Sequence, residues 1–149
     1  SAGGHLAAMA GTKFDYGMKS PTDDIDKASS RPDVAVLCYA VVSMLEMNKH
    51  RDDDDKRIVD EKQLEYLSAN INTPKDAPEM FMWHTAEDPV VPVEHSMMMV
   101  RALKDVGINS ELHIYPDGRH GIGLDKSCDA YRWAAQCEVF LTNRGFANK

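Results

Sequence analysis

The sequence has no apolar run long enough to cross a membrane, and among its 149 residues it has only three cysteines, Cys38, Cys128 and Cys137. An odd number of cysteines cannot form a complete disulfide framework. Cys38 lies in an apolar run and is expected to be a buried small hydrophobe, whereas Cys128 and Cys137 could pair, although nothing demands it. A recognisable signal peptide and internal repeats are also missing. The chain is therefore expected to form one globular domain.

Basic charge is also scarce, because 17 Lys and Arg residues face 24 Asp and Glu residues and give a net charge of -7. This balance argues against nucleic acid or an anionic membrane surface as the main partner. Much of the acidity is local, in Asp52 to Asp55, so it says little about a substrate. The run from Asp52 to Lys56 (DDDDK) is expected to be a solvated acidic loop.

Three short segments predict strands, and the first of them, a continuous apolar run, predicts a buried one. They are Val34–Val42 (VAVLCYAVV), Met80–Thr85 (MFMWHT) and Glu111–Tyr115 (ELHIY). A short run that is apolar on both faces and rich in β-branched residues is typical of a parallel strand covered on both sides. Residues 12–33 are polar and contain two prolines, which predicts a long surface connection.

Helical patterns alternate with these segments. They cover Ser1–Gly11, Asp60–Asn70, Pro92–Val106 and Asp129–Asn143. The side chains expected to face the core are Leu64 and Leu67, then Val93, Met97, Val100 and Leu103, and finally Trp133, Val139, Phe140 and Leu141. Strands that alternate with helices predict an α/β fold with parallel strands in a three-layer α/β/α arrangement.

The first candidate site residue is Ser1, which opens the segment SAGGH at the head of a predicted helix. In a nucleophile elbow, a serine occupies a sharp turn into a helix, and small neighbours let the backbone pack closely. The N–H of the next residue, Ala2, would face the oxyanion, and the helix dipole would favour the negative charge there. Ser1 is therefore a candidate nucleophile and Ala2 a candidate oxyanion donor.

Two further candidates follow predicted strands. Asp88 comes after MFMWHT and precedes Pro89, which favours an extended backbone at the rim where α/β sheets place their sites. Glu87 is the rival acid. His120 lies in the loop Gly118-Arg119-His120-Gly121 after ELHIY. The order Ser, Asp, His is the α/β-hydrolase order, which predicts a triad of Ser1, Asp88 and His120.

Four stretches carry a family resemblance: SAGGHLAA, SSRPDVAVLCYAVVS, WHTAEDPVVPVEHS and ELHIYPDGRHGIGL. Together they resemble the acetyl-esterase, acetylxylan-esterase and feruloyl-esterase-like branch of the α/β-hydrolases, from Ser1 to about Leu124. The resemblance implies the C-terminal half of an α/β-hydrolase beginning at the nucleophile. The Gly-x before the serine, the HGG-type oxyanion loop and the early strands of the family are not in this sequence.

The resemblance implies a carboxylic ester hydrolase that forms an acyl-enzyme, with an acetylated carbohydrate such as xylan as substrate and no cofactor. One rival interpretation is an inactive partial domain, whose first strand would have an unpaired edge and favour a homodimer. Another is an N-terminal-nucleophile hydrolase that uses the amine of Ser1 as base. A peptidase of related fold is the less favoured reaction.

The other histidines are assigned structural roles. No pair of them has metal-ligand spacing, so no metal is expected. His5 is expected to pack or hydrogen-bond near the elbow, His84 and His113 to be ordinary strand residues, and His50 and His95 to be exposed. Trp83 is expected in the core or in a pocket wall.

Overall fold

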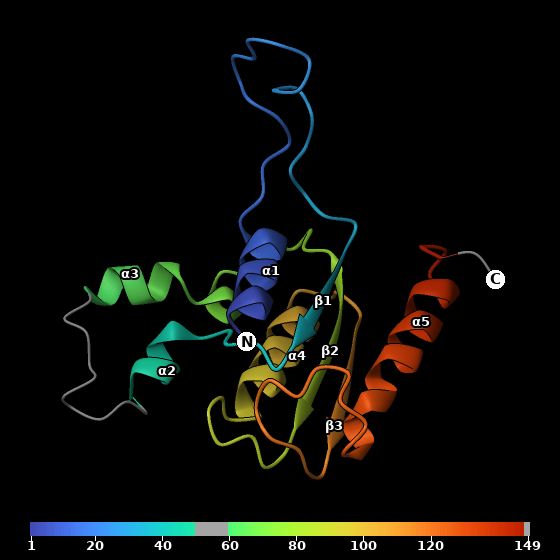
Figure 1. Cartoon of the computed structure of the whole chain (residues 1–149). Helices are drawn as coiled ribbons and strands as arrows, with labels where there is room; N and C mark the ends of the chain where they lie inside the picture. The colour runs from blue at the N-terminus through green and yellow to red at the C-terminus, as the bar shows by residue number, and fades with distance from the viewer. Residues whose placement is uncertain (50–59, 148–149) are drawn as a thin grey trace.

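Three parallel strands organise the fold in the computed structural model, which describes residues 1–49 and 60–147. The strands are β1 (Val34–Cys38), β2 (Glu79–Thr85) and β3 (Ser110–Tyr115), paired in the order β1-β2-β3 (Figure 1). Val34 pairs with Glu79, and Met80 pairs with Ser110. The helices are α1 (Ala2–Thr12), α2 (Met44–Lys49), α3 (Glu61–Tyr66), α4 (Glu94–Asp105) and α5 (Trp133–Asn143), with 3-10 turns η1 (Ala69–Ile71) and η2 (Asp129–Arg132).

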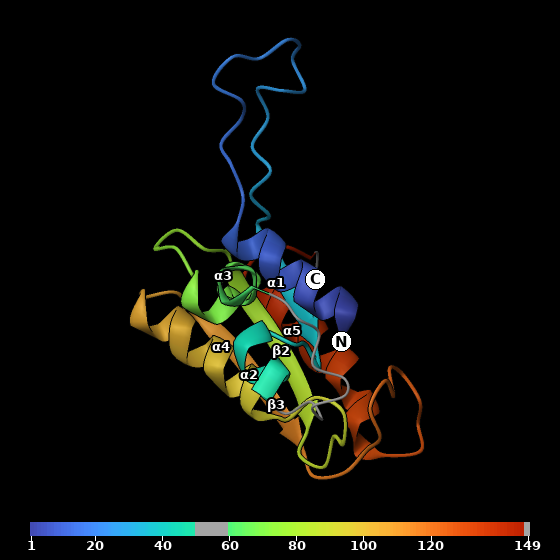
Figure 2. The same cartoon turned by 90° about the vertical axis from the view of Figure 1, so that its left-hand side faces the viewer.

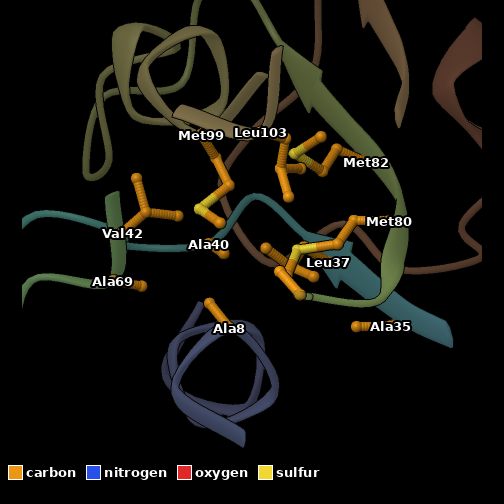
Figure 3. Packing of buried hydrophobic residues seen from close by; sticks show 11 residues of the cluster. Ala8, Ala35, Leu37, Ala40, Val42, Ala69, Met80, Met82, Met99 and Leu103 are labelled. Atoms are coloured by element: carbon orange, nitrogen blue, oxygen red, sulfur yellow. The ribbon is translucent and has the colours of Figure 1, made fainter. Parts of the chain in front are cut away.

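The side chains of β2 alternate between the two faces of the sheet and divide the core in two. Met80 and Met82 pack with α1 and α4 (Figure 3), whereas Phe81 and Trp83 pack with α5. Figures 1 and 2 show α1 and α4 on one side of the sheet and α5 on the other. The predicted three-layer α/β/α arrangement is therefore confirmed. β2 is the most buried strand because it has strands on both edges and helices on both faces.

The first strand is shorter than the segment Val34–Val42 predicts. It ends at Cys38, because Tyr39 has a φ of 38°, in the left-handed region that interrupts an extended strand. Ala40 and Val42 are nonetheless buried, so the apolar run continues as a packed loop. In this segment the apolar pattern correctly predicts which residues are buried, but it does not predict where the extended strand ends.

The predicted helix Asp60–Asn70 is also shorter in the structure. Asp60 caps α3 by accepting the N–H of Lys62, and the helix ends at Tyr66. The hydroxyl of Ser68 then donates to the carbonyl of Leu64 and accepts the N–H of Met44, which fixes the turn toward η1. The acidic run Asp52–Lys56 and His50 lie outside the described residues.

Three predicted burial assignments are wrong. Met97 is 47% exposed and Val139 is 55% exposed, whereas His95 is buried with 1% exposed. The inward face of α4 runs through His95, Met99 and Leu103, at helical spacing, so Met97 points away from the sheet. In α5, Cys137 and Phe140 face inward, which turns Val139 toward solvent.

Residues 13–33 form a long irregular arm between α1 and β1, as the polar composition predicts. Figures 1 and 2 show it projecting from the strand-start end of the sheet. Its hydrogen bonds are mostly internal, such as Met18 N–H to the carbonyl of Asp26 and Asp15 N–H to Ser30 Oγ. Among residues 1–49 and 60–147, none of the helices has both the length and the apolar character to cross a bilayer.

Close packing of α1 on β1 explains one of the two adjacent glycines of SAGGH. A Cβ on Gly4 would lie 2.6 Å from the Cβ of Ala40 and 3.1 Å from the carbonyl oxygen of Cys38, whereas a Cβ on Gly3 would meet nothing within 4 Å. We expect Gly4→Ala to lower the free energy of unfolding by about 1–3 kcal/mol, because helix and strand must separate. The matched control Gly3→Ala should raise it by up to about 1 kcal/mol through helix propensity. Urea unfolding of both variants measures this contrast, and equal effects would contradict it.

Candidate active site

The candidate residues meet at one edge of the sheet. Because the strands are parallel, their carboxyl ends share an edge, and the loops after β1, β2 and β3 carry Tyr39, Asp88 and His120. Figures 1 and 2 both show the first residue of the chain beside the carboxyl end of β1. Ser1 therefore joins this edge from the start of α1.

Asp88 and His120 are hydrogen-bonded. The Nδ1 of His120 lies 2.7 Å from Oδ2 of Asp88, and the Asp88 side chain is only 1% exposed. The other carboxylate oxygen, Oδ1, accepts the N–H groups of Val90 and Val91 at 2.9 and 3.0 Å. Both oxygens of the acid are thus engaged, which fixes the orientation of the carboxylate.

The pKa of Asp88 reflects these bonds. Burial alone would raise the pKa of this carboxyl, but the N–H of Val91, the imidazole of His120 and the N–H of Val90 together lower it below its ordinary value. Asp88 is therefore ionised at neutral pH. An ionised acid accepts the Nδ1–H of His120 and leaves Nε2 of that ring as a proton acceptor.

The loop that carries His120 is anchored at both ends. Thr85 donates its hydroxyl hydrogen to the carbonyl of Gly118 at 2.9 Å, and Nε1 of Trp133 donates to the carbonyl of Gly123 at 2.8 Å. Gly118 has a φ of 138°, and a Cβ there would lie 2.9 Å from the methyl of Thr85. A glycine two residues before the histidine is therefore required for this backbone conformation and this close approach.

Ser1 is the N-cap residue that precedes α1, and it lines a cavity at the same edge. Its carbonyl accepts the N–H of His5 at 2.8 Å. The cavity has a volume of about 260 Å³ and is lined by Ser1, Ala2, His5, Val41, Met44, Met47, Val90 and Val91. Within the described residues, the hydroxyl of Ser1 forms no hydrogen bond to His120. Catalytic hydrogen bonds are often formed only in the substrate complex.

Ala2 is the first residue of α1. Its N–H has no acceptor within the helix, because the first turn of a helix leaves its N–H groups unpaired. Glu87, the rival acid, is exposed on the loop that carries Asp88. The structure thus brings Asp88 and His120 together, places Ser1 and Ala2 in the wall of a cavity whose lining also includes Val90 and Val91 of the Asp88 loop, and leaves Glu87 at the surface.

Two residues of this edge were not predicted. The ring of Tyr39 packs edge-to-face on His120, with centroids 5.1 Å apart, and on Trp83 at 4.9 Å. The positive φ of Tyr39 could not be predicted from the sequence, because Tyr39 lies in an apolar run that is typical of an extended strand. His84 is a strand residue as predicted, yet both of its ring nitrogens are hydrogen-bonded beneath Asp88. The short separation of His84 and Asp88 in the sequence is the observation from which a contact between them could have been predicted.

The remaining assignments concern histidines, tryptophan and cysteines. His5 bonds through Nε2 to the carbonyl of Leu67 at 2.9 Å, which confirms its predicted role near the elbow, and Trp83 is a core residue stacked on Trp133. Cys38, Cys128 and Cys137 are free thiols, and Cys38 is only half-buried. In the described ranges, no cluster of three His, Cys, Asp or Glu side chains suits a metal ion.

A parallel sheet with helices on both faces and an acid and a histidine at its carboxyl edge is the arrangement of an α/β-hydrolase. Solved structures agree with this class. An acetyl ester-xyloside bifunctional hydrolase from Caldicellulosiruptor lactoaceticus matches with a TM-score of 0.90 and 39% identity, over 99% of this chain and 56% of that one. Esterase 2 of Thermogutta terrifontis with bound propionate matches with a TM-score of 0.75 and 25% identity, over 100% of this chain and 55% of that one.

The chain belongs to the prolyl oligopeptidase family, which matches residues 1–144. A curated relative, endo-1,4-beta-xylanase B of Butyrivibrio fibrisolvens, is 30% identical over 127 residues, which cover 82% of this chain and 19% of that protein. The chain thus spans just over half the length of its solved relatives and about a fifth of the curated one. The predicted resemblance to esterases of the α/β-hydrolase fold is confirmed.

Proposed function

We propose that this chain carries the catalytic residues of a carboxylic ester hydrolase, with Ser1 as nucleophile, His120 as general base and Asp88 as the acid that orients it. The hydrogen bond between Asp88 Oδ2 and His120 Nδ1, at the edge where Ser1 precedes α1, carries this proposal. It is the arrangement that leaves the second ring nitrogen of a histidine free to accept a proton.

The proposed reaction has two halves. His120 Nε2 takes the proton of the Ser1 hydroxyl as Oγ bonds to the ester carbonyl carbon, and the N–H of Ala2 donates to the developing oxyanion. His120 then gives the proton to the leaving alcohol, and the acyl group remains on Ser1. A water molecule, deprotonated by the same histidine, attacks the acyl carbon. The bond from that carbon to Ser1 Oγ then breaks, His120 returns the proton to Oγ, and the carboxylic acid is released.

We further propose an acetylated carbohydrate as the substrate class. One relative is named as an acetyl ester-xyloside bifunctional hydrolase and another as a xylanase. The cavity beside Ser1 is small and has Val41, Val90 and Val91 in its wall, which suits a short apolar acyl group such as acetyl.

Covalent labelling tests the nucleophile. The Thermogutta terrifontis relative is described as phosphorylated by paraoxon. In the full polypeptide, we expect paraoxon to add one diethylphosphoryl group to Ser1 and to stop hydrolysis of p-nitrophenyl acetate. Peptide mapping by mass spectrometry locates the label, and Ser1→Ala should not be labelled there. A label on another residue, or peptide cleavage without ester hydrolysis, would overturn the proposal.

A further inference from the structure

A buried histidine lies directly beneath the acid of the site. His84 is the next-to-last residue of β2 and is 0% exposed. Its Nε2 lies 2.9 Å from the carbonyl oxygen of Val91 and 3.5 Å from Oδ2 of Asp88, and its Nδ1 lies 2.8 Å from Oγ of Ser96. The ring therefore links strand β2, the loop after it and helix α4.

The partners define the tautomer of this ring. A carbonyl oxygen only accepts, so Nε2 carries the hydrogen and donates it to Val91. Nδ1 then accepts the hydroxyl hydrogen of Ser96. Burial is the main cause that lowers the pKa of His84, and His120 acts in the same direction, whereas the carbonyl of Val91, Asp88 and Glu94 act against it. The imidazole is therefore neutral and serves as a fixed donor and acceptor.

Val91 is held on both sides by the two buried groups. Its N–H donates to Oδ1 of Asp88, and its carbonyl accepts from His84. Nε2 of His84 also lies 3.5 Å from Oδ2, the oxygen that accepts from His120. A chain of contacts thus runs from His84 through Val91 to Asp88 and then to His120.

We propose that His84 is a positioning residue, which holds the loop of residues 88–91 so that the Asp88 carboxylate faces His120. This inference rests on the proposed function. The relevant atom is Nε2, because that nitrogen contacts the loop, whereas Nδ1 contacts only α4. His84 exchanges no proton in the reaction and acts through Asp88.

Two amide replacements separate the roles of the ring nitrogens. The amide nitrogen of His84→Gln reaches the position of Nε2, whereas that of His84→Asn reaches only the position of Nδ1. We expect His84→Gln to keep kcat for p-nitrophenyl acetate within about threefold, and His84→Asn to lower it by about 10- to 100-fold through misplacement of the acid. KM should change by less than about twofold, and Ser96→Ala, which alters only the Nδ1 side, should resemble His84→Gln.

A second readout does not depend on turnover. The proton between His120 Nδ1 and Asp88 gives a downfield signal in the proton NMR spectrum, which we expect to persist in His84→Gln and to shift or broaden in His84→Asn. Two results would overturn the positioning role. One is an equal loss of kcat and of the downfield signal in both amide variants, and the other is a loss of both that only follows the fraction of folded protein measured by urea unfolding. If the unmodified protein hydrolyses no ester, the proposed function fails, while the NMR comparison still decides the role of His84.

Discussion

Replacing Ser1 or His120 by alanine should lower kcat for ester hydrolysis by about 10⁵- to 10⁶-fold, and the double variant should be no worse than either single one. The reason is that the two residues act as one unit. Without the base, the serine hydroxyl is a weak nucleophile, and without the serine, the base has no proton to remove. A rate measurement on p-nitrophenyl acetate with each single variant and the double variant tests this equality.

The matched control is another histidine of the same sheet. His113→Gln changes a residue of β3 whose Nε2 contacts Glu111 at 2.7 Å and which has no contact with Asp88. Its kcat should stay within about twofold, as is usual for a side chain outside a site. If the effects of Ser1→Ala and His120→Ala simply multiply in the double variant, the two residues do not share a step.

The Asp88→Asn variant should lose about 10⁴-fold in kcat, although it only replaces one carboxylate oxygen with an amide NH₂ group. The oxygen of the new amide must occupy the Oδ1 position, because that site accepts the N–H groups of Val90 and Val91. The amide NH₂ then faces Nδ1 of His120, where it can only donate. His120 must accept at Nδ1 and carry its hydrogen on Nε2, so it can no longer take the proton of Ser1.

The exposed neighbour provides the control for this substitution. Glu87→Gln removes the rival acid of the same loop, and we expect a change in kcat below about twofold. A large loss in Glu87→Gln with a small one in Asp88→Asn would exchange the two assignments.

The same variant reports on acid stability. The folded protein lowers the pKa of Asp88 below its unfolded value of about 3.9, so the ionised acid stabilises the fold at neutral pH. This stabilisation is fully present above that value and is lost as the pH falls through the lower folded pKa. Urea unfolding should show the unmodified protein more stable than Asp88→Asn at pH 7, with a gap that closes below about pH 4.

The sequence predicts the elements of this fold better than their ends. The run MFMWHT corresponds to a strand that is buried almost throughout, whereas ELHIY corresponds to a strand whose residues are only partly buried or exposed. The apolar pattern extended the predicted first strand to Val42, because the packed loop after Cys38 is buried too. Met97 shows the other limit, since three consecutive methionines hide which one faces the core.

The acid and the histidine could be predicted because each follows a strand and because Asp, Gly and Pro mark the loops. Tyr39 could not, since a positive φ depends on how the chain leaves β1 and packs on His120. The buried bonds of His84 depend on Ser96 and Val91, which only the packing of α4 and the loop after β2 brings to the ring.

The central position of β2 has a consequence for how the protein folds. Each neighbour of β2 is distant in sequence, since Val34 pairs with Glu79 and Met80 pairs with Ser110. Parallel pairing of this kind has a high contact order, so folding is expected to be slow. Each pairing requires a long loop to close, and the entropy of closure is lost before the new strand contacts stabilise the fold. Asp88 and His120 meet only after the second loop has closed. A chain in which β2 and β3 have not yet paired therefore has no assembled acid–base pair.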